Sequence, residues 1–89
     1  MEKLKFVRIF LADVQETYYD VLYENIAEFE HNCARGQGFY IDDTDCLSFS
    51  KDSSMRARVT GAFIPASRID VILEAEMSIE EAVRRGYIR

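Results

Sequence analysis

Residues 13–34 read DVQETYYDVLYENIAEFEHNCA, a stretch with six acidic residues and no lysine or arginine. At 3.6 residues per helical turn, the larger apolar side chains of this stretch fall within one broad arc. The members of the arc are Val14, Tyr18, Val21, Leu22, Ile26, Phe29 and Cys33. The spacing predicts one long helix over residues 13–34, with this arc packed against the rest of the chain.

Four of the acidic residues stand at strict i, i+4 spacing and form a stripe along the predicted helix. They are Glu16, Asp20, Glu24 and Glu28, and Tyr19 and Tyr23 border them. Like charges at this spacing weaken a helix slightly, and a solvated helix face usually mixes the two signs. We therefore interpret the stripe as a surface for a basic, nucleic-acid-binding type of protein partner. There are two alternatives: the stripe is a solvent-exposed face that binds no partner, or it pairs with the chain's own arginines.

The residues before this stretch predict a central β-strand. In KLKFVRIFLA, residues 3–12, Val7, Ile9 and Leu11 point to one side, while Leu4, Phe6 and Phe10 point to the other. Because both sides are apolar, we expect neighbouring strands on both edges and some cover on both faces.

Four strands and a second helix are predicted after residue 38. The strands are two short ones over 39–42 and 46–50 and two longer ones over 55–64 and 69–76, and the helix is over 79–85. In the last strand, alternation places Ile69, Val71, Leu73 and Ala75 inward. In the strand before it, Gly61 and Phe63 share the core face, opposite Ala62 and Ile64. Ser78 and Glu81 form a capping box at the second helix.

The predicted fold is therefore a single α+β domain in the order β-α-β-β-β-β-α. We expect a two-layer sandwich: a mostly antiparallel sheet of four or five strands, one long helix packed on one face, and a short C-terminal helix. A chain of 89 residues with 48% hydrophobic residues can bury one core.

The charge is unevenly divided. Residues 1–45 carry four basic and ten acidic residues, whereas residues 46–89 carry seven basic and six acidic residues. An acidic chain is a poor direct ligand for nucleic acid, because phosphate contacts dominate that affinity. No apolar run is long enough for a membrane span. The two cysteines, Cys33 and Cys46, lack metal-binding spacing, so we expect reduced thiols in a cytoplasmic protein.

Two further functions are consistent with the sequence. One is a homodimeric binding domain for an anionic small molecule or nucleotide, with an arginine patch on the sheet; its residues would be Tyr40, Arg56, Arg58 and Arg68. The other is a structural subunit that associates with copies of itself. The leading function is a small regulator or inhibitor that binds a protein partner. We expect no enzymatic activity, cofactor or metal, since no catalytic motif is present and the Asp-rich segment 42–45 is typical of a turn.

Overall fold

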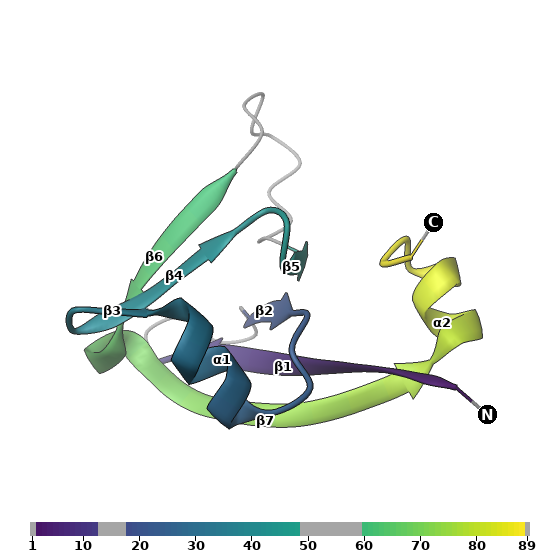
Figure 1. The fold of residues 1–89 in the computed structure, drawn as a ribbon, viewed down its shortest axis with the longest axis horizontal. Helices are drawn as coiled ribbons and strands as arrows, with labels where there is room; N and C mark the ends of the chain where they lie inside the picture. The colour runs from purple at the N-terminus through teal and green to yellow at the C-terminus, as the bar shows by residue number, and fades with distance from the viewer. Residues whose placement is uncertain (1, 13–17, 49–59, 89) are drawn as a thin grey trace.

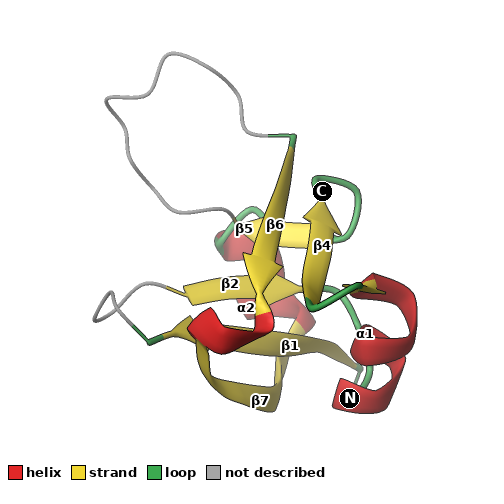
Figure 2. Ribbon diagram, turned by 90° about the vertical axis from the view of Figure 1, so that its left-hand side faces the viewer, coloured by secondary structure: helices red, strands yellow, loops and turns green. Residues whose placement is uncertain are grey.

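The structure, a computed structural model, describes residues 2–12, 18–48 and 60–88. In these residues two antiparallel sheets and two α-helices form a mixed α+β fold (Figures 1 and 2). The four-stranded sheet has the order β5 (Cys46–Ser48), β2 (Tyr18–Val21), β1 (Lys3–Leu11), β7 (Ile69–Ser78). The three-stranded sheet has the order β3 (Ala34–Arg35), β4 (Gly38–Asp42), β6 (Gly61–Pro65). The helices are α1 (Ile26–Cys33) and α2 (Ile79–Arg84), and a short 3-10 turn, η1 (Ala66–Arg68), precedes β7.

The predicted α+β class and the central position of the first strand are confirmed. Strand β1 lies between β2 and β7 and pairs antiparallel with both. Val7 and Ile9 are fully buried on one face of the sheet, and Phe6 is buried on the other face. The apolar character of both sides of this strand thus reflects cover on both faces.

The prediction of one long helix over residues 13–34 is wrong. Residues 18–21 form strand β2, and the helix begins only at Ile26. In β2 the side chains alternate: Tyr19 and Val21 face the core, while Tyr18 and Asp20 face the opposite side, next to Phe10 and Arg8 of β1. Aromatic and β-branched residues favour strands. The same residues satisfy a helical period, and pairing with β1 decides between the two structures.

The actual start of α1 carries a capping signal of its own. The Asn25 side chain accepts a hydrogen bond from the backbone N–H of Glu28 at 2.8 Å. In return, the Glu28 carboxylate accepts from the backbone N–H of Glu24 at 2.9 Å. One backbone donor of the first turn, the N–H of Glu28, is thereby paired by the cap. The Glu28 carboxylate binds the residue before the N-cap, so the arrangement is a capping box displaced by one residue.

The main core lies where the four-stranded sheet, the three-stranded sheet and α1 meet. Strands β4 and β6 rise at an angle from the larger sheet, and α1 lies beside them on the same side (Figure 1). The buried residues of this core are Val7, Ile9, Val21, Phe29, Cys33, Ile41 and Ile64. The rings of Phe29 and Phe39 stack with their centroids 4.9 Å apart, which joins α1 to β4.

The predicted inward faces of the last two strands are reversed in part. In β7, Ile69 and Ile72 pack on the core, whereas Val71 and Leu73 are 40% and 46% exposed. The cause is a register shift: Leu11 pairs with Ile69 and Phe10 pairs with Val71, so Asp70 is an extra residue. In β6, Ile64 is buried and Phe63 is 53% exposed, opposite to the prediction.

Several local predictions are confirmed. The Asp42 carboxylate accepts from the backbone N–H groups of Thr44 and Asp45, as expected of an Asp-rich turn. The Ser78 hydroxyl accepts from the Glu81 backbone N–H at 3.1 Å and caps α2.

Among the described helices, none has the length and apolarity that crossing a membrane requires.

Replacement of Asn25 tests the observed start of α1. Asn25→Ala should lower the free energy of unfolding by about 1 kcal/mol, because the cap of α1 is lost. Asn25→Asp, which keeps an acceptor oxygen, should stay close to the wild type. In a helix that continued through this position, Asn25→Ala would instead raise stability by a few tenths of a kcal/mol, because alanine is the better helix former. Urea unfolding followed by circular dichroism measures the sign of the change in the free energy of unfolding.

Candidate functional site

Strand β7 forms an open edge of the four-stranded sheet. It pairs with β1 along one side, and no strand of the described residues pairs with its other side. It is also long, with ten residues from Ile69 to Ser78, and it lies at the outer border of the sheet (Figure 2). An edge of this length presents a row of backbone donors and acceptors to any extended chain that approaches it.

One face beside this edge is acidic. Glu74 and Glu76 lie opposite Val7 and Lys5 of β1, on the face that α1 covers. The Glu74 carboxylate accepts the backbone N–H of Ile26 at 2.8 Å, so the start of α1 is held against β7. Glu76 pairs with Lys3 at 3.1 Å, and both of these side chains are about half exposed.

The start of α1 adds two more carboxylates to this face. Glu24 and Glu28 are both exposed. Two adjoining hollows share Lys5 and Glu24; Glu74 and Glu76 line one of them, and Leu22, Tyr23 and Glu28 line the other. We call the carboxylates of Glu24, Glu28, Glu74 and Glu76 the acidic face of β7.

The opposite face beside the same edge is apolar. Val71 lies opposite Phe10, and Leu73 lies opposite Arg8. The rings of Phe10 and Tyr18 contact each other with their centroids 5.7 Å apart and extend this surface across β1 to β2. We call Val71, Leu73 and Phe10 the apolar face of β7. Strand β7 therefore has an acidic face and an apolar face on its two sides.

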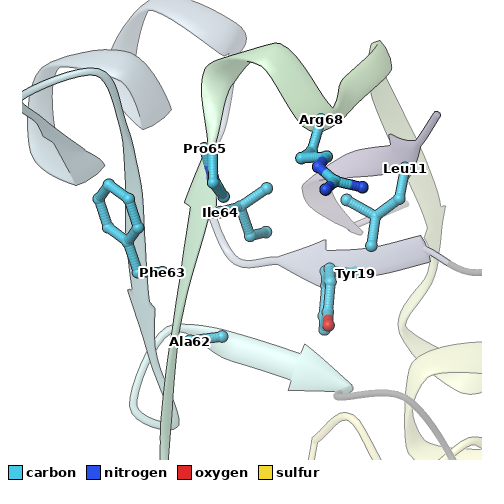
Figure 3. A pocket seen from close by; sticks show the side chains of 7 residues that line it. All are labelled: Leu11, Tyr19, Ala62, Phe63, Ile64, Pro65 and Arg68. Carbon is cyan, nitrogen blue, oxygen red and sulfur yellow. The ribbon is translucent and has the colours of Figure 1, made fainter. Parts of the chain in front are cut away.

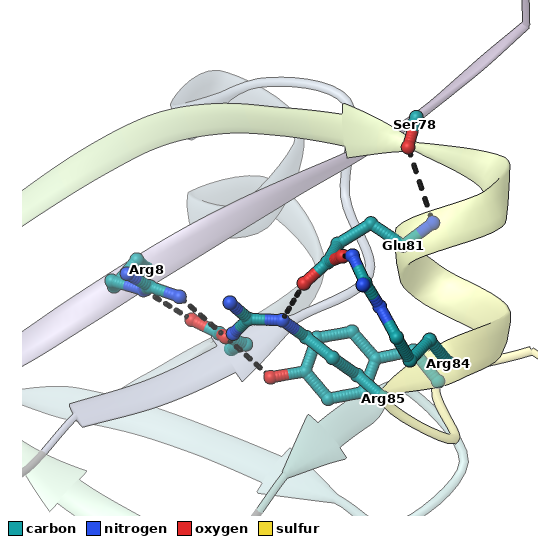
Figure 4. A network of polar contacts seen from close by, with 7 residues as sticks. Arg8, Ser78, Glu81, Arg84 and Arg85 are labelled. Carbon is teal, nitrogen blue, oxygen red and sulfur yellow. Dashed lines mark hydrogen bonds and ion pairs between the residues drawn. The ribbon is translucent and has the colours of Figure 1, made fainter.

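Of the six residues predicted to bind a partner, Glu24 and Glu28 lie in this site, but Asp20 does not. Asp20 is completely buried on the opposite side of the sheet from the acidic face, so its assignment to an exposed acidic stripe is wrong. Its carboxylate accepts from Arg8 Nε at 2.7 Å and Nη2 at 3.0 Å, and from the Tyr87 hydroxyl at 2.9 Å (Figure 4). The carboxylate in turn raises the pKa of the Arg8 guanidinium.

The two tyrosines of the predicted stripe also separate. Tyr23 is half-buried and not an exposed border of the stripe: its hydroxyl donates to Asp45 at 2.8 Å and accepts from the Cys33 thiol at 3.3 Å. Burial, together with these two contacts, raises the pKa of Tyr23. Tyr19 lies on β2 and packs against the core, beside Leu11. Glu16 lies outside the described residues.

The alternative ligand-binding set is likewise divided. Tyr40 is 38% exposed on β4, with the Arg35 guanidinium 5.2 Å from its ring centre. Arg68 belongs to η1 and lines a separate hollow that Tyr40 does not line. Arg56 and Arg58 lie outside the described residues. The structure therefore does not bring Tyr40 and Arg68 into one site.

Four residues of this site, Val71, Leu73, Glu74 and Glu76, are not among those predicted from the sequence. A signal was present, because residues 69–78 carry three acids, no base and an alternating aliphatic set. Such a strand is suited to an edge, where charged side chains limit unwanted pairing.

The chain matches no protein-family model, no curated protein and no solved structure.

Two single substitutions distinguish the buried Asp20 from the exposed Glu24. Asp20→Ala leaves Arg8 and the Tyr87 hydroxyl without their shared partner, and should lower the free energy of unfolding by roughly 3 kcal/mol. Glu24→Ala removes the same charge from an exposed position and should change it by no more than about 0.5 kcal/mol. Equal effects in urea unfolding would show that Asp20 is not the buried partner of Arg8.

Proposed function

We propose that this protein is a small, non-enzymatic interaction module that binds an extended, basic segment of a protein partner along the edge of β7. The single observation that carries the proposal is the open edge itself, flanked by an acidic face on one side and an apolar face on the other. Such binding is β-strand addition, in which backbone hydrogen bonds supply affinity and alternate side chains supply specificity. A regulator or inhibitor could act in this way.

The two faces of β7 define the partner sequence. Successive side chains of an added strand point to opposite faces of the sheet. One set would therefore lie beside Glu74 and Glu76, and the other beside Val71 and Leu73. The expected partner segment alternates Lys or Arg with aliphatic residues.

The charge of β7 favours a different protein over a second copy of this chain. Between Ile69 and Ser78 the strand contains Asp70, Glu74 and Glu76 and no basic residue. In a symmetric antiparallel pair of β7 strands, like faces would adjoin, so carboxylates would lie next to carboxylates. Like charges across a strand pair are destabilising. Self-association is therefore the weaker candidate at this edge.

Complementary charge should act mainly on encounter and on the choice of partner. Lys5 lies among the four carboxylates of the acidic face, and Lys3 pairs with one of them, Glu76. The surface around this face therefore has a modest excess of negative charge. The proposed setting is the cytoplasm, where the thiols of Cys33 and Cys46 would stay reduced.

Synthetic peptides of defined pattern test this function directly. A ten-residue peptide of alternating Lys and Val should bind at least about 10-fold more tightly than a peptide of the same composition with its lysines and valines in separate blocks; that ratio corresponds to about 1.4 kcal/mol. Fluorescence anisotropy measures both affinities. Equal affinities would show that charge alone attracts the peptide, and would contradict strand addition.

Backbone methylation identifies the hydrogen-bonding edge. Two versions of the alternating peptide carry N-methyl groups, either on every Lys or on every Val. Strand addition uses the N–H groups of only one of these sets, so one version should lose binding and the other should keep it. Retention of binding by both versions would exclude pairing along an edge.

Charge reversal locates the site on this protein. The double variant Glu24→Lys with Glu76→Lys should lower the affinity for the alternating peptide at least about 10-fold. Each exposed charge contributes up to about 1 kcal/mol, and its reversal adds repulsion. The matched control is Glu30→Lys with Glu80→Lys, which makes the same charge change at exposed positions that line neither hollow. An equal loss in the control would place the effect in net charge and not at β7.

A further inference from the structure

Another hollow lies where the two sheets diverge, away from the two hollows at the acidic face of β7. Its volume is about 270 Å³, and it is lined by Leu11 and Tyr19 of the four-stranded sheet, by Ala62, Phe63, Ile64 and Pro65 of β6, and by Arg68 of η1. Figure 3 shows Leu11, Arg68 and Tyr19 on one side of the opening and Ala62 and Ile64 of β6 pointing toward them, while the Phe63 ring points away from the opening. The hollow therefore lies at the seam between the sheets, a usual place for ligand pockets.

Among the residues that the structure describes, the lining of this hollow combines an apolar wall with one cationic side chain, that of Arg68. Five of its seven residues, all except Tyr19 and Arg68, have side chains without nitrogen or oxygen. The Arg68 guanidinium points toward Leu11, on the same side of the opening (Figure 3). A planar guanidinium binds carboxylates through two parallel hydrogen bonds, a geometry that lysine does not offer.

The backbone around the hollow is held in place by hydrogen bonds that do not depend on a ligand. Ile64 at its base is buried in the core, and β6 pairs with β4 from Gly61 to Pro65. The Ala12 backbone N–H donates to the Arg68 carbonyl at 2.8 Å, which ties η1 to the end of β1. The two walls are thus connected, and the hollow is largely formed before any ligand arrives.

We infer that this hollow binds a small apolar monocarboxylate, with the apolar body against Leu11 and Ile64 and the carboxylate on Arg68. An apolar cavity of about 150 Å³ is known to hold benzene, so about 270 Å³ has room for one ring with a short chain. Because the chain carries a net charge of −5, an anion would be repelled by most of the surface, and Arg68 supplies the local attraction. This site is separate from the proposed function at β7.

The test compares three probes that differ in one feature each. They are 3-phenylpropanoate, the uncharged 3-phenylpropanol of similar shape, and acetate, which lacks the ring. Titration followed by methyl and amide NMR should give saturable binding of 3-phenylpropanoate at least 10-fold tighter than that of either control, with shifts at Leu11 and Ile64. Absence of saturation, or shifts centred on Val71 and Leu73 instead, would overturn the inference.

Two variants and a control test separately where the carboxylate and the apolar body of the ligand bind. Arg68→Gln should remove the 10-fold preference for the acid over the alcohol, and the Arg84→Gln control, which makes the same charge change on α2, should keep it. Ala62→Leu fills the hollow while Arg68 remains, and should weaken both aromatic probes. Unchanged binding in Arg68→Gln or in Ala62→Leu would contradict this site, and the NMR spectrum of each variant verifies that it is folded.

Discussion

The bidentate ion pair between Arg8 and Asp20 is the interaction on which the arrangement of this fold depends. Asp20 is fully buried, and Arg8 lies directly opposite it in the β1–β2 pair. A buried carboxylate is tolerable only when its charge is paired and its lone pairs accept hydrogen bonds, and here Arg8 and Tyr87 supply three donors. The Arg8 guanidinium also lies 4.2 Å from the centre of the Tyr18 ring. A shift in the register of β2 by one residue would break all of these contacts.

The register of β2 has consequences for the rest of the molecule. With residues 18–21 in a strand, Val21 enters the core and α1 begins after the short connection to Asn25. The helix is then short, and its N-terminus meets Glu74 of β7. On the opposite face of the sheet, Tyr87 reaches Asp20, so the segment after α2 is tied to the same ion pair. One cross-strand contact thereby helps to position both ends of the chain.

The proposed sites follow from the way the sheets end. Strand β7 has no strand of the described part of the chain along its outer side, and the start of α1 adds Glu24 and Glu28 to the carboxylates already on its face. The hollow lined by Arg68 exists because β6 diverges from the larger sheet beyond the core. An edge offers backbone groups to another chain, whereas a seam offers apolar volume to a small molecule. The two sites therefore suit different ligands and can be tested independently.

The sequence by itself determined the α+β class, the central place of β1, the Asp-rich turn at Asp42 and the capped C-terminal helix. The turn and the helix cap depend on local side-chain-to-backbone hydrogen bonds, and the place of β1 depends on side chains that are apolar on both faces of the strand. Only the tertiary structure decided that residues 18–21 form a strand, because their spacing fits a helical and an extended period equally well. It also decided which side of β7 faces the core, since one extra residue, Asp70, reverses the alternation. Asp20 and Glu24 are both acids in one local pattern, yet Arg8, twelve residues away from Asp20, makes one of them a buried structural group and leaves the other on the surface.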